Sequence, residues 1–201
     1  LVVGVLVYVQ TESGQGRIQS IVVGQIQNLL ADDAEVTAEG LSGNFLTGAR
    51  LTGLTVRRDG EVLLRVDTVL VDYNLTTLLR RTFSASELVV AGPALYVRQR
   101  ADSTFNVAGL LKPAEDTTGR GFAVVLDAAL VRNGYAEVRW LHPDRDSVHV
   151  VRDLSLVVHD FVSREDSLVG TIDALDLVAL APFDAGRARV SGSGRFSRDD
   201  L

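Results

Sequence analysis

The chain has 201 residues, of which 46% are hydrophobic and 23% charged, and it contains neither Cys nor Met. This length suits one domain or two small ones, and the apolar fraction excludes a disordered tail. Without Cys there is no disulfide scaffold, no thiolate nucleophile and no Cys-based metal centre. A formal net charge of -6 argues against nucleic-acid binding through bulk electrostatics, which needs a basic face. Because Met is absent even from position 1, we expect the chain to be a piece of a longer protein.

The first nine residues carry no charge and read Leu-Val-Val-Gly-Val-Leu-Val-Tyr-Val. A transmembrane helix needs about 20 apolar residues, so this run alone cannot cross a membrane. It is either the end of a membrane anchor, with Tyr8 in the interfacial belt, or a buried strand. The local pattern leaves both interpretations open. Gly14 lies in the polar stretch that follows, where we expect a helix to end.

Residues 14–33 are predicted to contain an amphipathic helix. Apolar residues recur at spacings of three and four, with glutamines between them: Ile18, Ile21, Val22, Ile26 and Leu29. Such spacing places them on one face of a helix. Asp32 and Asp33 end the pattern. We expect the apolar stripe to be buried against the sheet that follows.

Beyond residue 34 the chain is predicted to be almost entirely β-strand, with short helical turns at 74–80 and 106–111 and a loop at 112–121. Alternation of apolar and polar residues, as in 135–140, is typical of half-buried antiparallel strands. Turn signals separate the runs: Asp59-Gly60, Gly92-Pro93, Asn133-Gly134 and Pro143-Asp144. Asn-Gly suits a type I′ turn, which needs two residues with positive φ. We therefore predict a hairpin of strands 122–132 and 134–141.

Several predicted strands, such as 61–73 and 122–131, are apolar on both faces. A sheet that is wetted on one side does not need this pattern. One explanation, which is the commoner, is that other parts of the protein pack against both faces. The other is that one face contacts a hydrophobic ligand. Residues 87–97 and 128–138 are also weakly similar in sequence and form an internal repeat. Interpreted as a strand, a Gly-containing turn and a strand, it indicates stacked hairpins in an elongated β structure.

The sequence lacks the residue patterns of catalytic and metal sites. His142, His149 and His159 do not have the spacing of a helical zinc motif, and we expect His149 and His159 to be solvated polar residues. There is no nucleophile elbow and no phosphate-binding glycine loop. Adjacent carboxylates such as those at 32–33 and 199–200 point apart in a helix or strand, so a shared-proton pair is not expected. We predict a protein without enzymatic activity, catalytic residues, cofactor or metal.

A set of short motifs follows the amphipathic helix in a fixed order. They are Val36-x-x-x-Gly40-Leu-Ser-Gly43, Leu51-Thr-Gly-Leu-Thr-Val56, Asp59-Gly60, Val71-Asp-Tyr-Asn-Leu75 with Leu78-Leu79, Leu88-Val-Val-Ala-Gly-Pro93 and Phe105-Asn-Val-Ala-Gly-Leu-Leu111. In this order, over residues 1–111, the chain resembles the N-terminal part of AsmA-like and TamB (translocation and assembly module) envelope proteins. The order of the motifs carries the resemblance, since each of them alone is degenerate.

The resemblance implies a single-pass anchor in the bacterial inner membrane, of which residues 1–13 would be the end. It also implies an elongated, taco-like antiparallel β-groove in the periplasm, with units at 34–111 and 122–201. Members of this family are thought to carry phospholipids between the inner and outer membranes or to help outer-membrane protein assembly. TamB-like proteins pair with an outer-membrane barrel partner through a C-terminal region that this chain lacks.

The apolar strands and the resemblance lead to one hypothesis, a groove that takes up phospholipid acyl chains. Each acyl CH₂ that leaves water for the groove gains about 0.8 kcal/mol. The predicted lining residues are Val66, Leu70, Leu88, Val90, Leu95, Val97, Phe122, Val124, Leu126, Leu130, Val138 and Trp140. A one-residue shift in strand register would move them to the other face. A closed structural β-domain and an assembly chaperone that templates a client strand stay open as alternatives.

Overall fold

The computed structural model describes residues 12–74, 76–77, 82–112, 123–141, 147–163, 168–180 and 187–198. The described chain forms one helix and a ten-stranded sheet. The elements are α2 (Glu12–Leu29), β1 (Ala34–Thr37), β2 (Gly40–Ser42), β3 (Gly48–Arg58), β4 (Glu61–Asn74), β5 (Thr82–Ala91), β6 (Ala94–Arg98), β7 (Ala123–Trp140), β8 (Ser147–Ser163), β9 (Leu168–Leu180) and β10 (Arg187–Arg198).

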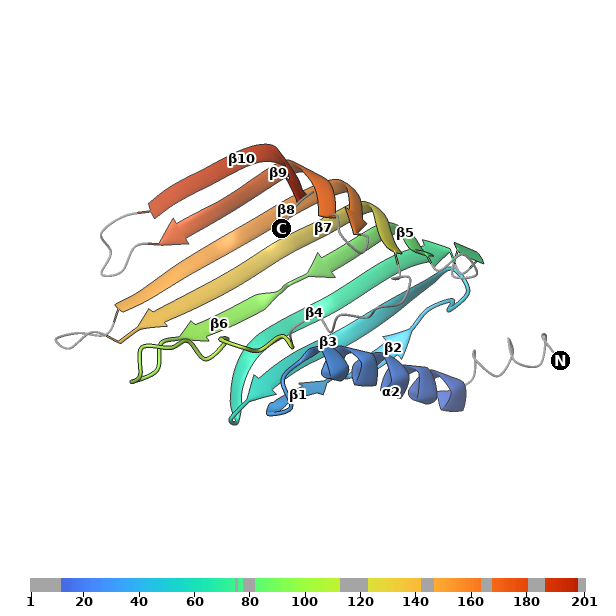
Figure 1. Cartoon of the computed structure of the whole chain (residues 1–201), viewed down its shortest axis with the longest axis horizontal. Helices are drawn as coiled ribbons and strands as arrows, with labels where there is room; N and C mark the ends of the chain where they lie inside the picture. The colour runs from blue at the N-terminus through green and yellow to red at the C-terminus, as the bar shows by residue number, and fades with distance from the viewer. Residues whose placement is uncertain are drawn as a thin grey trace.

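The strands lie side by side in the order β1-β3-β4-β5-β7-β8-β9-β10, with β2 beside β3 and β6 between β4 and β7 (Figure 1). Neighbours are antiparallel, except that β7 runs parallel to both β5 and β6. The prediction of a mainly β fold is confirmed, but the sheet is mixed rather than wholly antiparallel. The chain crosses the sheet between β6 and β7, so β7 starts at the same end as β5.

The predicted amphipathic helix is present, and its residues Ile18, Val22 and Ile26 pack against the buried core. Two details differ from the prediction. The helix begins at Glu12 and continues through Gly14, where a preceding helix was expected to end, since a glycine inside a helix costs only about 1 kcal/mol relative to alanine. Ile21 and Leu29 are exposed, so the buried stripe is narrower than predicted.

Within the described residues no helix has the length and apolarity that a membrane span needs. The first eleven residues, which hold most of the predicted anchor, lie outside the described part of the chain. The loop predicted at 112–121 also lies largely outside it, as do the Pro143-Asp144 turn and most of the helical turn at 74–80. The Asn74 side-chain Oδ1 accepts the Thr76 N–H at 2.9 Å, as the capping residue at the start of a helical turn does.

The predicted hairpin at Asn133-Gly134 is wrong, because β7 passes straight through it as one strand. Asn133 has a φ of 55°, whereas Gly134 is not among the positive-φ residues. A single left-handed residue makes a bulge, while a type I′ turn needs two in succession. Asp59-Gly60 has both, with φ of 52° and 78°, and it does turn the chain from β3 into β4.

The two segments of the weak repeat are neighbours in the sheet. Residues 87–97 run parallel to 128–138 in the register of the sequence repeat, with Glu87 opposite Ala128 and Val97 opposite Val138. The interpretation as stacked hairpins is wrong, because β5 and β6 follow one another along β7. A kink at Gly92, whose φ is 62°, joins them, and its N–H donates to the Arg132 carbonyl at 2.9 Å.

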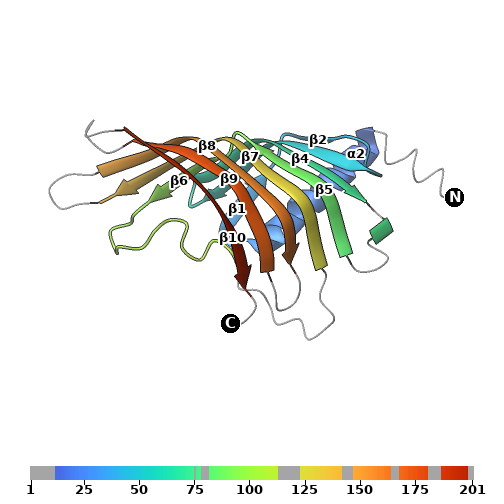
Figure 2. The same cartoon turned by 90° about the horizontal axis from the view of Figure 1, so that it is seen from above.

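A line of left-handed residues crosses the sheet at the level of this kink. Gly53 in β3, Gly92, Asn133 in β7 and Asp153 in β8 all have φ between 53° and 62°. Irregular residues of this kind bend and twist the strands that hold them. Seen from above, the sheet curves around the side that carries α2 (Figure 2).

Candidate functional site

The helix face of the sheet is the face against which α2 packs. Its buried apolar cluster consists of Leu30, Ala34, Val36, Leu41, Phe45, Leu51, Leu54, Val56 and Val66. These residues come from the end of α2, strands β1 to β4 and the turn before β3. The helix therefore covers one end of the sheet.

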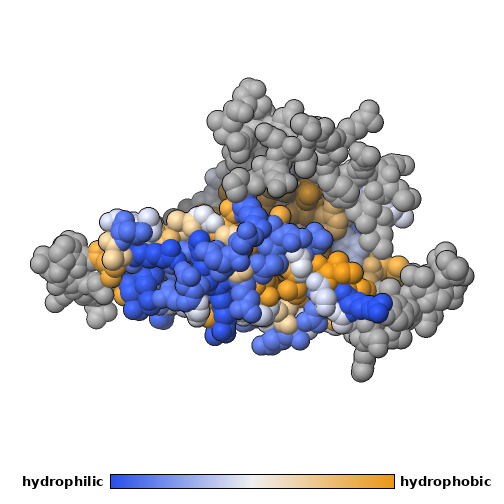
Figure 3. Space-filling model, turned by 60° about the horizontal axis from the view of Figure 1, so that its bottom comes forward, coloured by the Kyte–Doolittle hydropathy of each residue, from blue (hydrophilic) through white to orange (hydrophobic). Residues whose placement is uncertain are grey.

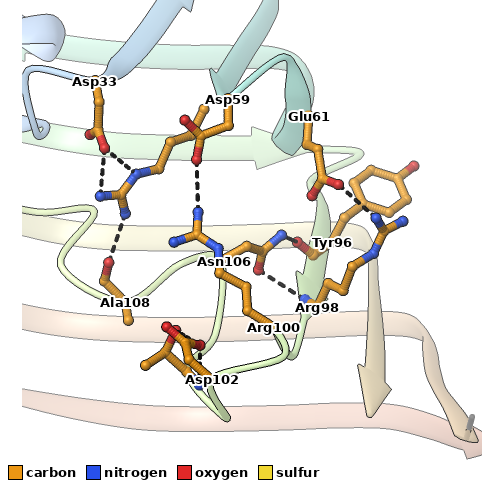
Figure 4. A network of polar contacts seen from close by, with 11 residues as sticks. Asp33, Asp59, Glu61, Tyr96, Arg98, Arg100, Asp102, Asn106 and Ala108 are labelled. Atoms are coloured by element: carbon orange, nitrogen blue, oxygen red, sulfur yellow. Dashed lines mark hydrogen bonds and ion pairs between the residues drawn. The ribbon is translucent and has the colours of Figure 1, made fainter. Parts of the chain in front are cut away.

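Residues 99–112, which we call the strap, cross the helix face from the end of β6 to the end of α2 (Figure 1). Near α2, the Ala31 N–H donates to the Leu110 carbonyl at 2.8 Å, and Leu110 packs against the buried cluster. The Arg58 guanidinium donates to the Ala108 carbonyl at 2.7 Å and pairs with Asp33 at 2.7 Å (Figure 4). The strap is thus tied to both the helix end and β3.

Asn106 holds the other end of the strap, and its side chain is only 4% exposed. Its Oδ1 accepts the Arg98 N–H at 2.8 Å, its Nδ2 donates to the Tyr96 carbonyl at 3.3 Å, and its own N–H donates to the Arg98 carbonyl at 2.9 Å. β4 pairs with β6 only at Leu64 and Arg65. Asn106 therefore completes the backbone hydrogen bonding of β6 where β4 diverges (Figure 4).

This role of Asn106 is not predictable from the sequence. The local pattern predicts a short helical turn at 106–111 that starts at Asn106, whereas the structure has a turn at 106–109 followed by extended chain. An asparagine before an apolar run is an ordinary helix-start signal. The tertiary structure determines which groups of β6 Asn106 bonds to, so no local sequence pattern predicts them.

The predicted lining residues divide between the two faces of the sheet. Those on the helix face are Val66, Leu88, Val90, Leu95, Val97, Val138 and Trp140. Leu95 is placed there because it pairs with Leu64, which packs against the buried cluster. Val97 pairs with Val138 on the same side, and the Trp140 ring meets Phe105 of the strap edge-on at 5.0 Å.

Leu70 and Leu130 lie on the opposite face. Leu70 follows Val69, which packs against the buried cluster, and successive side chains of a strand point to opposite faces. Leu130 pairs with Val89, the neighbour of Val90, so the same reasoning applies. The structure therefore does not bring the predicted residues together as one lining.

The other predicted lining residues lie near the start of β7. Val124 and Leu126 are half-buried and pair with Phe83 and Ala85 of β5. Among the described pairs, position 127 has no partner in β5 or β8, while the register is the same on either side of it. Phe122 lies outside the described residues.

Beyond the reach of α2 the helix face is largely apolar, and among described residues Phe105 of the strap contacts it at Trp140. We call this the open apolar surface, and it consists of Leu88, Val90, Leu95, Val97, Ala129, Val131, Val138, Trp140, Leu156 and Val158. Among the described side chains, those of β6 to β9 include no buried apolar residue, and Leu95 and Trp140 are 38% and 41% exposed. In the space-filling view, apolar residues remain visible between polar ones and in a recessed area (Figure 3).

The two described histidines lie on different faces of the sheet: His149 lies beside Val138 of the open apolar surface, and His159, which follows Val158, lies on the opposite face. His149 is exposed, as predicted, whereas His159 is half-buried, with Nδ1 at 3.1 Å from the Asp127 carbonyl and Nε2 at 3.5 Å from the Asp173 carboxylate. Within the described ranges, no group of three or more acidic or histidine side chains is arranged to hold a metal ion. His142 lies outside those ranges.

Comparisons with known proteins do not identify the chain. None of the known protein families matches it, and no curated protein is significantly similar to it. The AsmA-like resemblance therefore stays a prediction, and a function has to be argued from the surface itself.

Proposed function

We propose that the open apolar surface binds phospholipid acyl chains and that the chain is a non-enzymatic part of an envelope protein. One observation carries the proposal. The helix face carries apolar residues from β1–β4, where α2 and the strap cover it, to β5–β9, where described side chains leave most of it uncovered and His149 beside Val138 is an exposed polar residue. A sheet buries an apolar face against a second layer, and a large apolar patch without one is typical of a binding surface.

The side chains of this surface suit acyl chains in particular. Val, Leu and Ala offer apolar contact without a fixed polar partner, and transfer of each CH₂ from water gains about 0.8 kcal/mol. No single contact traps the ligand, so a lipid is free to slide along the strands. Because the strands curve around the helix side, the surface partly surrounds its ligand.

The covered end of the sheet limits where a lipid lies. Leu30 bridges to Leu111, and Leu110 packs on the buried cluster, so the strap and α2 close the helix face over β1 to β4. The acyl chains then lie over β5 to β9. We further propose that the protein is anchored in the inner membrane, lies in the periplasm and transports phospholipid between the two membranes. Outer-membrane protein assembly through a barrel partner is a related role.

Lipid that co-purifies with the full chain tests the proposal. The chain is purified without detergent, extracted with organic solvent, and its phospholipid is quantified by mass spectrometry. Val158 lies on the open apolar surface and its neighbour Val157 on the opposite face, so Val158→Asp and Val157→Asp form a matched pair. We expect stoichiometric phospholipid in the wild type and in Val157→Asp, and its loss in Val158→Asp. Folded wild-type chain without lipid, or equal lipid in both variants, contradicts the proposal.

The strand-templating chaperone is a second candidate, favoured by the edge of the sheet at β10. Within the described residues β10 pairs with β9 alone, so one row of its backbone groups is available to another strand. This function depends on the backbone edge rather than on apolar side chains. Binding of an unfolded outer-membrane barrel segment that survives Val158→Asp would favour it over lipid binding.

A further inference from the structure

A cavity of about 420 Å³ opens where β4 and β6 diverge, and charged side chains line it. Its lining includes Glu61, Arg65, Tyr96, Arg98, Glu137 and Arg139. Arg65 follows Leu64, Tyr96 follows Leu95 and Arg139 follows Val138, and these three apolar residues lie on the helix face. The charged side chains therefore point to the opposite face, away from the open apolar surface.

Two of the arginines are direct neighbours. Arg98 of β6 pairs with Arg139 of β7 in the parallel register, which puts two positive side chains on the same face of adjacent strands. Like charges opposite one another destabilise a sheet. Each has one carboxylate partner: Glu61 lies 2.6 Å from Arg98, and Glu137 lies 3.2 Å from Arg139. Glu137 is shared, because the Tyr135 hydroxyl also donates to it at 2.9 Å.

Among the described residues, the third arginine has no carboxylate partner. The Arg65 guanidinium forms no hydrogen bond or ion pair with any residue that the structure describes. Three arginines and two glutamates line the cavity, so their charges sum to one positive charge. Guanidinium groups bind carboxylate and phosphate oxygens through paired N–H donors. An anion between Arg65, Arg98 and Arg139 would offset both the unpaired charge and the repulsion between the neighbours.

We propose that this cavity binds a small anion that carries a phosphate or carboxylate group. The Arg65, Arg98 and Arg139 side chains hold the anion, and the Tyr96 ring forms part of the wall. The three arginine side chains point to the face opposite the open apolar surface, although Val97 of that surface also borders the cavity. Because none of the arginines belongs to the apolar surface, either proposal can fail without the other.

Calorimetric titration of the full chain with inorganic phosphate at constant ionic strength tests the site. We expect saturable binding to one site in the wild type and at least about a tenfold loss of affinity in Arg65→Gln and Arg139→Gln, since hydrogen bonds to charged groups are strong. Arg50→Gln is the matched control, because Arg50 is an exposed arginine that pairs with Leu70 on the same face. It should bind phosphate as the wild type does.

Non-saturable binding in the wild type, or saturable binding that Arg65→Gln leaves unchanged, overturns the proposal. Circular dichroism checks the fold of each variant. Arg65→Gln removes no hydrogen bond or ion pair to a described residue, so it carries the test even where Arg139→Gln fails to fold. A second arm with dihexanoyl phosphatidate separates a lipid headgroup from free phosphate. If phosphatidate binds more tightly and still depends on Arg139, the headgroup is the source of the anion.

Discussion

Asn106 is the single residue on which the junction between the strap and the sheet depends most. Replacement by alanine leaves the Arg98 N–H and the Tyr96 carbonyl without their partners in a buried place. An unsatisfied buried polar group costs about 1–3 kcal/mol, so we predict that Asn106→Ala lowers the free energy of unfolding by at least this amount. Urea denaturation measures it. Asn28→Ala, on the exposed side of α2, should cause no loss, and equal effects of the two changes would contradict the role given to Asn106.

The ion pair between Asp32 and Lys112 ties the last residue of the strap to the end of α2, with a distance of 2.6 Å. The hydrogen bond and the charge of Lys112 lower the pKa of Asp32 below its ordinary value of 3.8. A lowered pKa in the folded state stabilises the fold above pH 3.8, and this contribution disappears as the pH falls through the folded-state pKa. Carboxyl ¹³C NMR should show the shift in the wild type and an ordinary value in Lys112→Gln. An identical Asp32 titration in both would show that the pair does not form in solution.

Single residues also show why similar sequence signals had different outcomes. Asp59-Gly60 and Asn133-Gly134 are both favourable turn sequences, yet only the first turns the chain. The pair at 59–60 has no strand partner to continue along, whereas β7 is held in line by β5 and β6 on one side and β8 on the other. The local sequence determines which φ values cost little free energy. Pairing with the neighbouring strands determines whether the chain turns.

At the scale of elements, the line of left-handed residues allows the long strands to bend together. Gly92 has a φ of 62°, and a Cβ there would meet the Asp67 side chain. A residue with a side chain costs about 1–2 kcal/mol in this conformation, so Gly92→Ala should lower the free energy of unfolding by that amount. Gly24 of α2 has open space around it, and Gly24→Ala should raise the free energy of unfolding by about 1 kcal/mol. Thermal denaturation compares the two, and the same sign for both would contradict the account of the bend.

Elements were predictable from the sequence where periodicity is local. The stripe at Ile18, Val22 and Ile26 and the alternation beyond residue 34 predicted the helix and the strands. Strand direction was not predictable in this way, because it depends on a crossing of the sheet between β6 and β7. The weak repeat did contain that information, since its two copies lie in parallel register. A repeat of this kind fits both a hairpin within each copy and pairing between the copies, and the structure has the second arrangement.

At the scale of the whole molecule, the candidate surface depends on which face of each strand meets α2. Alternation alone identifies two sets of residues in a strand but not which set faces the helix. Val66 and Leu70 are both predicted lining residues, and an even spacing would put them on one face of a regular strand. The structure separates them, because the pattern of the helix face changes between Val66 and Val69 near the left-handed Gly53. The sequence therefore predicts that an apolar lining exists. Which residues belong to it depends on the strand register of the whole sheet.

The central claim is that acyl chains contact the open apolar surface, and the only tryptophan of the chain lies on it. Phospholipid with bromine at mid-chain quenches tryptophan fluorescence on contact, so the measurement compares brominated with unbrominated lipid in the full chain. We predict quenching of Trp140 by the brominated lipid alone. Moving the tryptophan to the opposite face, with Trp140→Phe and Tyr96→Trp together, should abolish the effect. Unquenched Trp140, or equal quenching from both faces, would contradict the claim.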